Sequence, residues 1–210
     1  MILKVSPTRI ALLNLKKELK VAQKGHKLLK DKRDGLIKKF MAVIYEARSV
    51  RQSVEERLGQ AFDSYQRATM VGSPQALETA LLLPNAHVSL RVEIKNVMSV
   101  RIPEFSIKKE GSAFAYGFLD TPGDLDQAMV KFDEVFTDIL HLAQLEKTAE
   151  NLADEIEKTR RRVSALENVM IPNLHETIKF ISLQLEERAR DAIVSTMRVK
   201  AMIVAKEPQS

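Results

Sequence analysis

Few residues in this chain have the types and spacing that catalysis or metal binding requires. The four histidines, His26, His87, His141 and His175, do not share the i, i+4 spacing with which helical histidines hold one metal ion, and the motif H-E-x-x-H is absent. The chain contains no cysteine, which excludes thiolate zinc sites, cysteine nucleophiles and disulfides. We therefore expect no metal site.

Nucleotide binding and acid/base catalysis are equally unsupported. The seven glycines are scattered, and neither GxGxxG nor the phosphate-binding GxxxxGK[ST] occurs. The adjacent carboxylates Glu55–Glu56 and Glu186–Glu187 fall on predicted helix faces, where solvated charge is the usual explanation. We expect no catalytic residue and no cofactor.

Positive charge is concentrated near the N-terminus. Residues 1–40 hold twelve Lys or Arg against three acidic residues, whereas the whole chain carries only +5. The stretch from Lys16 to Arg33 has three interpretations: solvated helix surface, nucleic-acid binding, or an acidic protein partner. No aromatic residue that could stack on bases is interleaved with these lysines, which disfavours nucleic acid.

A long helix is predicted to position these lysines in a first segment, residues 1–70. Thr8 follows Pro7 and can start the helix. At 1.5 Å per residue, about sixty helical residues would reach roughly 90 Å, longer than a compact core requires. Apolar residues follow it in alternating steps of three and four: Leu12, Leu15, Leu19, Ala22, Leu29, Leu36, Phe40, Val43, Ala47, Val50 and Val54.

The middle segment, residues 71–123, has a different composition and holds four of the seven Pro and four of the seven Gly. Residues 88–95 alternate strictly between apolar and polar, which predicts a half-buried strand. Val100 and Ile102 continue this alternation beyond a turn or kink at Asn96. A second alternating run, predicted from Phe114, Tyr116 and Phe118, and a short helix over residues 76–83 complete a small α/β insertion with a β-hairpin.

The third segment, residues 124–210, is predicted to be another long helix, capped by Asp124. Its apolar line contains a four-plus-four step from Leu166 through Met170 to Leu174, a stutter that unwinds a supercoil locally. Pro172 is expected to kink the helix there. The line itself comprises Leu145, Ala149, Leu152, Ile156, Thr159, Val163, Leu166, Met170, Leu174, Ile178, Ile181 and Leu185.

Two long helices with one apolar seam each must bury those seams against each other. We therefore predict a mainly α fold, an antiparallel two-helix coiled coil with the insertion at the turn and the termini at the far tip. High charge (29%) and few aromatic residues (5%) agree with this fold. Removing residues 88–102 is expected to leave the coiled coil intact. No apolar run approaches the roughly 20 residues of a membrane span.

Two basic groups are expected to point away from the seam. Lys16, Lys20, Lys24 and Lys27 share one helix face by their three- and four-residue steps. Arg160–Arg162 are bracketed by the seam residues Thr159 and Val163, so we expect them on the outer face.

Several ordered motifs resemble the D subunit of the V-type and archaeal-type rotary ATPases. Ser6–Arg9, Leu12–Leu13, Leu15–Lys17 and Gly25–Asp34 carry the likeness at the start. Glu155–Glu167, Ile171–Pro172 and Thr177–Ile178 carry it at the end, and Val88–Ile102 with Tyr116–Gly117 in the middle. The family more often has Asn where this chain has Ser6 and Ser164, and Glu186–Arg190 lacks the usual acidic ending.

This resemblance implies a rotor shaft without catalytic activity. Its tip would lie in the hexamer of A and B subunits, and its lower part would bind the F subunit and the C (or d) subunit. The complex would be cytoplasmic, at the inner face of the membrane. The resemblance does not identify the transported ion, proton or sodium. The alternative is a structural coiled-coil protein that binds an acidic partner or nucleic acid, and copurification would separate the two.

The resemblance also suggests which residues contact partners. Those expected to contact the hexamer are Lys16, Lys20, Lys24, Lys27, Arg188 and Arg190. Those expected to contact other rotor subunits, or to serve regulation, are Arg160, Arg161, Arg162, Val88, Leu90, Val92 and Ile94.

Overall fold

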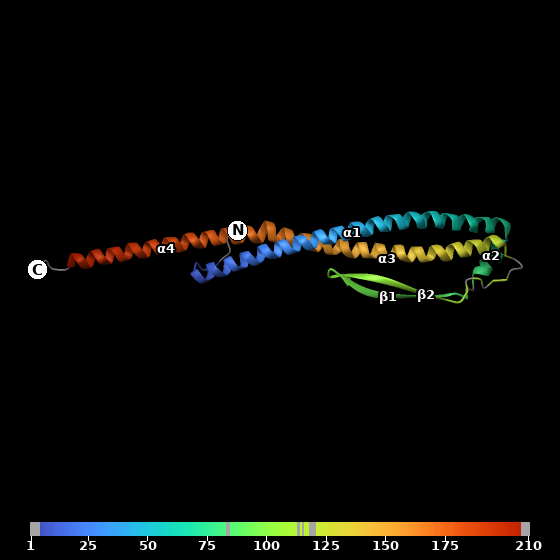
Figure 1. The fold of residues 1–210 in the computed structure, drawn as a ribbon, viewed down its shortest axis with the longest axis horizontal. Helices are drawn as coiled ribbons and strands as arrows, with labels where there is room; N and C mark the ends of the chain where they lie inside the picture. The colour runs from blue at the N-terminus through green and yellow to red at the C-terminus, as the bar shows by residue number, and fades with distance from the viewer. Residues whose placement is uncertain (1–4, 83–84, 113, 115, 118–120, 207–210) are drawn as a thin grey trace. The chain divides into compact units, whose positions relative to one another are not determined.

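The fold is known from a computed structural model that describes residues 5–82, 85–112, 114, 116–117 and 121–206 (Figure 1). The predicted mainly α fold, with two long helical arms and a hairpin between them, is confirmed. Its elements are α1 (Arg9–Val71), α2 (Pro74–Leu81), β1 (His87–Val97), β2 (Val100–Glu110), α3 (Gly123–Ala165), the π-helix η1 (Leu166–Met170) and α4 (Ile171–Lys206).

The chain divides into two compact units. The terminal unit comprises residues 1–33 and 158–210, and the insertion unit comprises residues 34–157. The helix α1 contributes its first part to the terminal unit and its remainder to the insertion unit.

The terminal unit is held by the predicted seam. Leu15 and Ala22 of α1 are buried with Leu174 and Ile181 of α4, and Ile181 is fully inaccessible to solvent. Thr8 starts α1 as expected, because the backbone N–H of Ala11 donates to its hydroxyl oxygen over 3.2 Å.

In the insertion unit, α1 packs on α3 through small residues and cross-links (Figure 1). Ala61 of α1 and Ala128 of α3 are both fully buried. The Arg57 guanidinium donates to the Asp138 carboxylate over 2.7 Å, and Phe62 meets Phe132 edge to face with ring centroids 5.4 Å apart. Arg51 pairs with Glu146, whose hydrogen bond to the guanidinium raises the arginine pKa.

The second strand of the hairpin lies earlier in the sequence than Phe114–Phe118, where it was expected. Strand β1 matches the alternating run, but the turn falls at Met98–Ser99 instead of Asn96, so Val100 and Ile102 belong to the second strand. Both turn residues have positive φ, 54° and 68°, which two-residue hairpin turns demand. The second strand predicted from Phe114, Tyr116 and Phe118 is wrong for Phe114 and Tyr116, which lie outside any strand; Phe118 lies outside the described residues.

The turn end of the hairpin is part of the insertion unit's core. Val100 is 4% exposed and packs with Leu36 of α1 and Leu152 of α3. The Met98 side chain lies so close to Gly35 that a Cβ there would meet its terminal carbon at 3.0 Å. Deleting residues 88–102 would therefore remove core contacts of the insertion unit. That the coiled coil stays assembled after this deletion remains a prediction.

The far end of the insertion unit closes around Tyr116. This side chain is buried with Ala68, Leu77 and Leu125, which belong to α1, α2 and α3. Asp124, expected as the cap of α3, lies instead within its first turn, because the helix begins at Gly123. The short helix α2 begins two residues before its predicted start, at Pro74.

Tyr116 gives the insertion unit a pH dependence in the alkaline range. Burial raises the pKa of its hydroxyl, and the hydrogen bond donated to Asp126 over 2.6 Å raises it further. Above about pH 10 the unfolded tyrosine ionises while the folded one stays protonated, so this contribution to stability is lost as pH rises. We expect the wild type's melting temperature to fall more steeply above pH 10 than that of Tyr116→Phe. Equal slopes in melts monitored by circular dichroism would contradict this.

Candidate partner-binding surfaces

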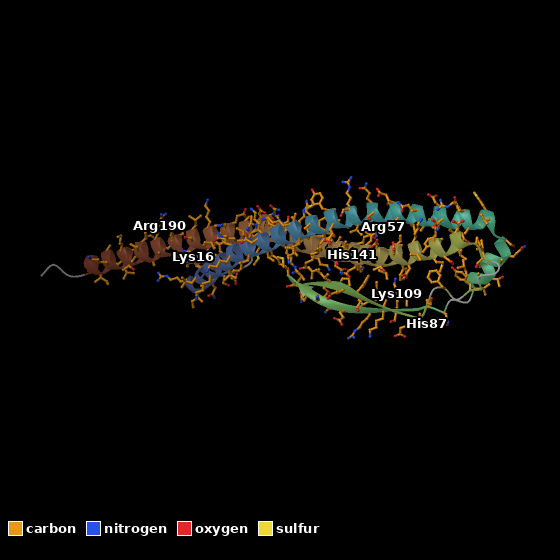
Figure 2. All side chains as sticks on the ribbon, turned by 45° about the vertical axis from the view of Figure 1, so that its right-hand side comes forward. Lys16, Arg57, His87, Lys109, His141 and Arg190 are labelled. Atoms are coloured by element: carbon orange, nitrogen blue, oxygen red, sulfur yellow. The ribbon has the colours of Figure 1, made fainter. Side chains whose placement is uncertain are left out.

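The basic face on α1 has the predicted orientation. Lys16, Lys20, Lys24 and Lys27 are all exposed, on the side of the helix away from the buried Leu15 and Ala22. Within the part of the chain that the structure describes, none of the four forms an ion pair. Lys16, the first lysine of this face, is labelled in Figure 2.

Arg188 and Arg190 differ in their contacts. The Arg188 guanidinium donates to the backbone carbonyl of Pro7 over 2.9 Å, so it ties the start of the chain to α4. The Arg190 side chain is 74% exposed and lies 3.7 Å from Glu187 on the same helix, a weak surface pair. Arg190 is thus the more available of the two for another protein.

Arg160, Arg161 and Arg162 lie on the outer surface, as expected. All three are exposed, while the flanking Thr159 and Val163 are 1% and 3% exposed. The triplet therefore adds positive charge to the terminal unit's surface without entering its seam.

Strand β1 is more exposed than a half-buried strand should be. Its apolar row, Val88, Leu90, Val92 and Ile94, is 44–68% exposed. The neighbouring β2 is attached to α3: the Phe105 N–H donates to Gln144 over 2.9 Å, and the Asn151 amide donates to the Arg101 carbonyl over 2.9 Å.

Lys109 adds a third attachment of β2 to α3. Its ammonium reaches Asp133 over 2.6 Å (Figure 2). Side chains of α3 thus attach β2 at Arg101, Phe105 and Lys109. The apolar row of β1 is exposed.

The predicted stutter takes the form of the π-helix η1. The Ile171 N–H bonds to the Leu166 carbonyl, five residues back, where a regular α-helix would use the carbonyl four residues back. The next residue, Pro172, has no backbone N–H to donate. The extra residue in this turn moves Met170 off the seam. The Met170 side chain is 45% exposed. Single π-helical turns of this kind often occur at functional positions.

His26 lies on α1 beside this π-helix. Its Nε2 atom is 3.5 Å from a Glu167 carboxylate oxygen, and it is shielded from solvent without a hydrogen-bond partner among the described residues. None of the described His, Asp and Glu side chains gather in a group of three that could hold a metal ion. His26 is thus a packed residue of the seam region.

The C-terminal part of α4 is a surface that sequence reasoning did not single out. Every residue from 186 to 203 is exposed, although many are apolar. The signal was present in the sequence as apolar residues that no longer follow one line: Ile193, Val194, Met197, Val199, Met202 and Ile203.

Fold and surfaces together define a class: a mainly α protein with two long helical arms, a β-hairpin between them, and exposed basic and apolar surfaces. A family model that describes the D subunit of ATP synthase matches residues 11–201. The chain belongs to this D-subunit family. No helix in the described ranges has the length and apolar character needed to cross a membrane.

Curated relatives agree over nearly the full length. The V-type ATP synthase D subunit of Fusobacterium nucleatum is 46% identical over 96% of this chain and 97% of that protein. The protein of the same name from Acetivibrio thermocellus is 47% identical over 97% of this chain and 93% of its own length. The one from Clostridioides difficile is 45% identical over the same shares.

Proposed function

We propose that this chain is the central rotor shaft of a V/A-type rotary ATPase and catalyses nothing itself. It transmits torque between a hexamer of A and B subunits and the membrane rotor, coupling ATP hydrolysis or synthesis to proton or sodium transport. Family membership over residues 11–201 supports this role. The alternative, a structural coiled-coil protein that binds an acidic partner or nucleic acid, is not supported by the comparisons.

The exposed end of α4 is the observation that carries the proposal. Ile193 and Met197 share one side of the helix, whereas Met202 lies on the opposite side at 3.6 residues per turn. All three are at least 55% exposed. A helix that is apolar on several sides is stable when it is surrounded by protein. The collar of A and B subunits supplies such a surrounding.

The three segments divide the work of the shaft. Residues 1–70 and 124–210 form the two-helix shaft, and only its tip, near the chain termini, enters the hexamer. The insertion, residues 71–123, exposes the apolar row of β1 and serves docking or regulation. The F subunit and the C (or d) subunit bind the lower part, and the assembled complex lies at the cytoplasmic face of the membrane.

Torque transmission follows from asymmetry. A two-helix shaft inside a collar of three alternating pairs presents a different side to each catalytic interface. An interface that prefers one side of the shaft is stabilised when that side faces it, and by reciprocity the state of the interface biases the shaft's orientation. The Arg57–Asp138 ion pair joins α1 to α3 within the insertion unit.

The basic face provides a direct test. Changing Lys16, Lys20, Lys24 and Lys27 together to Gln should leave folding intact, because all four are exposed. Each exposed pair is worth about 0–1 kcal/mol, so we expect the loss to become measurable only in combination. Binding of the variant, with its F partner, to A/B hexamer should weaken and become less sensitive to salt.

A variant with Lys38, Lys39, Lys95 and Lys108 changed to Gln makes the same change in charge elsewhere. It should bind the hexamer as the wild type does. If the α1 variant keeps the wild-type affinity and salt slope, the basic face is only solvated. If the wild-type chain copurifies with nucleic acid and without the A, B and F proteins, the rotor proposal fails.

A further inference from the structure

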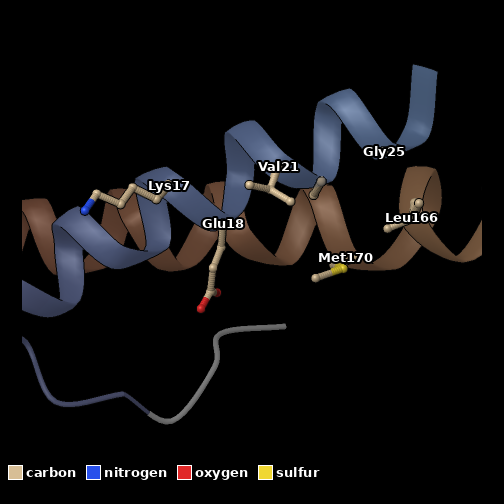
Figure 3. Close-up of a pocket in the computed structure, with 7 residues that line it drawn as sticks. Lys17, Glu18, Val21, Gly25, Leu166 and Met170 are labelled. Atoms are coloured by element: carbon tan, nitrogen blue, oxygen red, sulfur yellow. The ribbon is translucent and has the colours of Figure 1, made fainter. Parts of the chain in front are cut away.

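An apolar groove of about 420 Å³ opens on the terminal unit between α1 and η1 (Figure 3). Val21 and Met170 on its walls are 69% and 45% exposed, so two large apolar side chains face solvent together. Its lining residues are Lys17, Glu18, Val21, Ala22, Gly25, Leu166 and Met170.

Two local features create the groove. The π-helical turn begins at Leu166, which is half-buried, and leaves Met170 45% exposed beside the seam. Across from them, Gly25 has no side chain, and a Cβ built there would meet no atom within 4 Å. A larger residue at position 25 would have closed the hollow.

The rim of the groove is positively charged. Lys17, Val21 and Lys24 follow one another on α1 at i, i+4 and i+7, so both lysines flank the apolar wall. Arg162 precedes Leu166 by one helical turn on the opposite side. Two anions lie beside them, Glu18 among the lining residues and the exposed Glu167 next to Leu166, so the three cations leave the rim with a net positive charge. Within the described chain, neither lysine nor Arg162 has an ion-pair partner.

We propose that this groove receives a large apolar side chain from an acidic segment of the A/B collar. The inference rests on the proposed function, which makes the collar the neighbour of the terminal unit. An apolar hollow selects an apolar side chain, and the cationic rim selects a segment with carboxylates beside it. The volume lies within the range of small binding pockets, so it accommodates an anchor but not a whole helix.

A shallow, single-anchor contact also suits a rotor. One apolar side chain can leave the groove without unfolding either partner, and the next collar protein can then enter it. The groove thereby marks one side of the shaft as different from the others. A shaft with a uniform surface would hold no preferred orientation against the collar.

Filling the groove tests the proposal. In Gly25→Met the new side chain enters open space and should occupy the hollow without disturbing the seam. Gly59→Met is the matched control, because Gly59 also lies in α1 with nothing within 4 Å of a built Cβ, but belongs to the insertion unit. Each variant is assembled with its F partner and titrated with A/B hexamer. We expect binding at least tenfold weaker for Gly25→Met and unchanged for Gly59→Met.

A second pair of variants tests the charge of the partner. Val21 is exposed, so Val21→Glu and Val21→Lys should both fold. If an acidic segment binds, Val21→Glu should weaken hexamer binding several-fold more than Val21→Lys. Equal affinities for these two variants would overturn the acidic partner, even if Gly25→Met failed to fold.

The outcomes separate the two proposals. A wild-type chain that does not bind the hexamer at all contradicts the rotor assignment, and the groove proposal falls with it. A wild-type chain that binds normally, with Gly25→Met binding as tightly as Gly59→Met, overturns the groove and leaves the rotor assignment standing.

Discussion

The substitution Ile181→Asp is expected to unpair the helices of the terminal unit. Ile181 is fully buried and packs in one cluster with Leu15, Ala22 and Leu174. A carboxylate there has no partner, and burying an unpaired charge in place of a core side chain costs more than about 3 kcal/mol. We expect a loss of helical circular dichroism, or a large drop in the first melting transition.

The control lies two residues further along α4. Leu183 is 57% exposed, so Leu183→Asp makes the same chemical change on the solvent side of the same helix. Its effect should stay within about 0.5 kcal/mol. If both variants melt like the wild type, Ile181 is not a core residue of a stable helix pair.

The second large effect is expected at the end of α4. Changing Ile193, Met197 and Met202 to Ser should weaken binding to the A/B hexamer by roughly a thousandfold. Burying a large apolar side chain contributes about 1.5–3 kcal/mol, so three contribute at least about 4.5 kcal/mol, whereas a thousandfold loss of affinity corresponds to about 4 kcal/mol. All three side chains are exposed in the isolated chain, so its melting temperature should not change.

Met70→Ser combined with Val71→Ser provides the comparison. These residues are 83% and 73% exposed at the C-terminal end of α1, within the insertion unit. This variant should bind the hexamer normally. An unchanged dissociation constant for the α4 variant would mean that the hexamer does not surround this helix with apolar surface. The principal support for the rotor assignment would then be lost.

The long helices were predictable because their signal is local and repeated. Leu15, Leu36, Val163 and Ile181, all named from apolar spacing alone, are 5% exposed or less. The stutter before Pro172 also appears in the sequence, and η1 occupies residues 166–170. In both cases the apolar spacing that predicts the feature lies within a few residues of the feature itself.

The hairpin was predicted only in part. The alternation of residues 88–95 indicated β1 correctly, but β2 was placed at residues 114–118 because aromatic alternation there resembles a strand. The observed turn uses Met98 and Ser99, which lack the glycine or asparagine usual at positive φ. The pairing is stabilised by contacts distant in sequence, such as Val100 with Leu36 and Leu152, which periodicity does not reveal.

The sequence by itself determined the two helical arms, their seams, the outward direction of the basic face and the family. The arms, the seams and the basic face depend on residue spacing along one chain, which helix geometry converts directly into faces. The family was indicated by the resemblance of its ordered motifs. Only the tertiary structure decided where the hairpin docks, that β1 keeps its apolar row exposed, and that Gly25 faces a π-helical turn across a groove. Each of these depends on which residues of two distant segments come to lie opposite each other, and many registers satisfy the same apolar pattern until packing selects one.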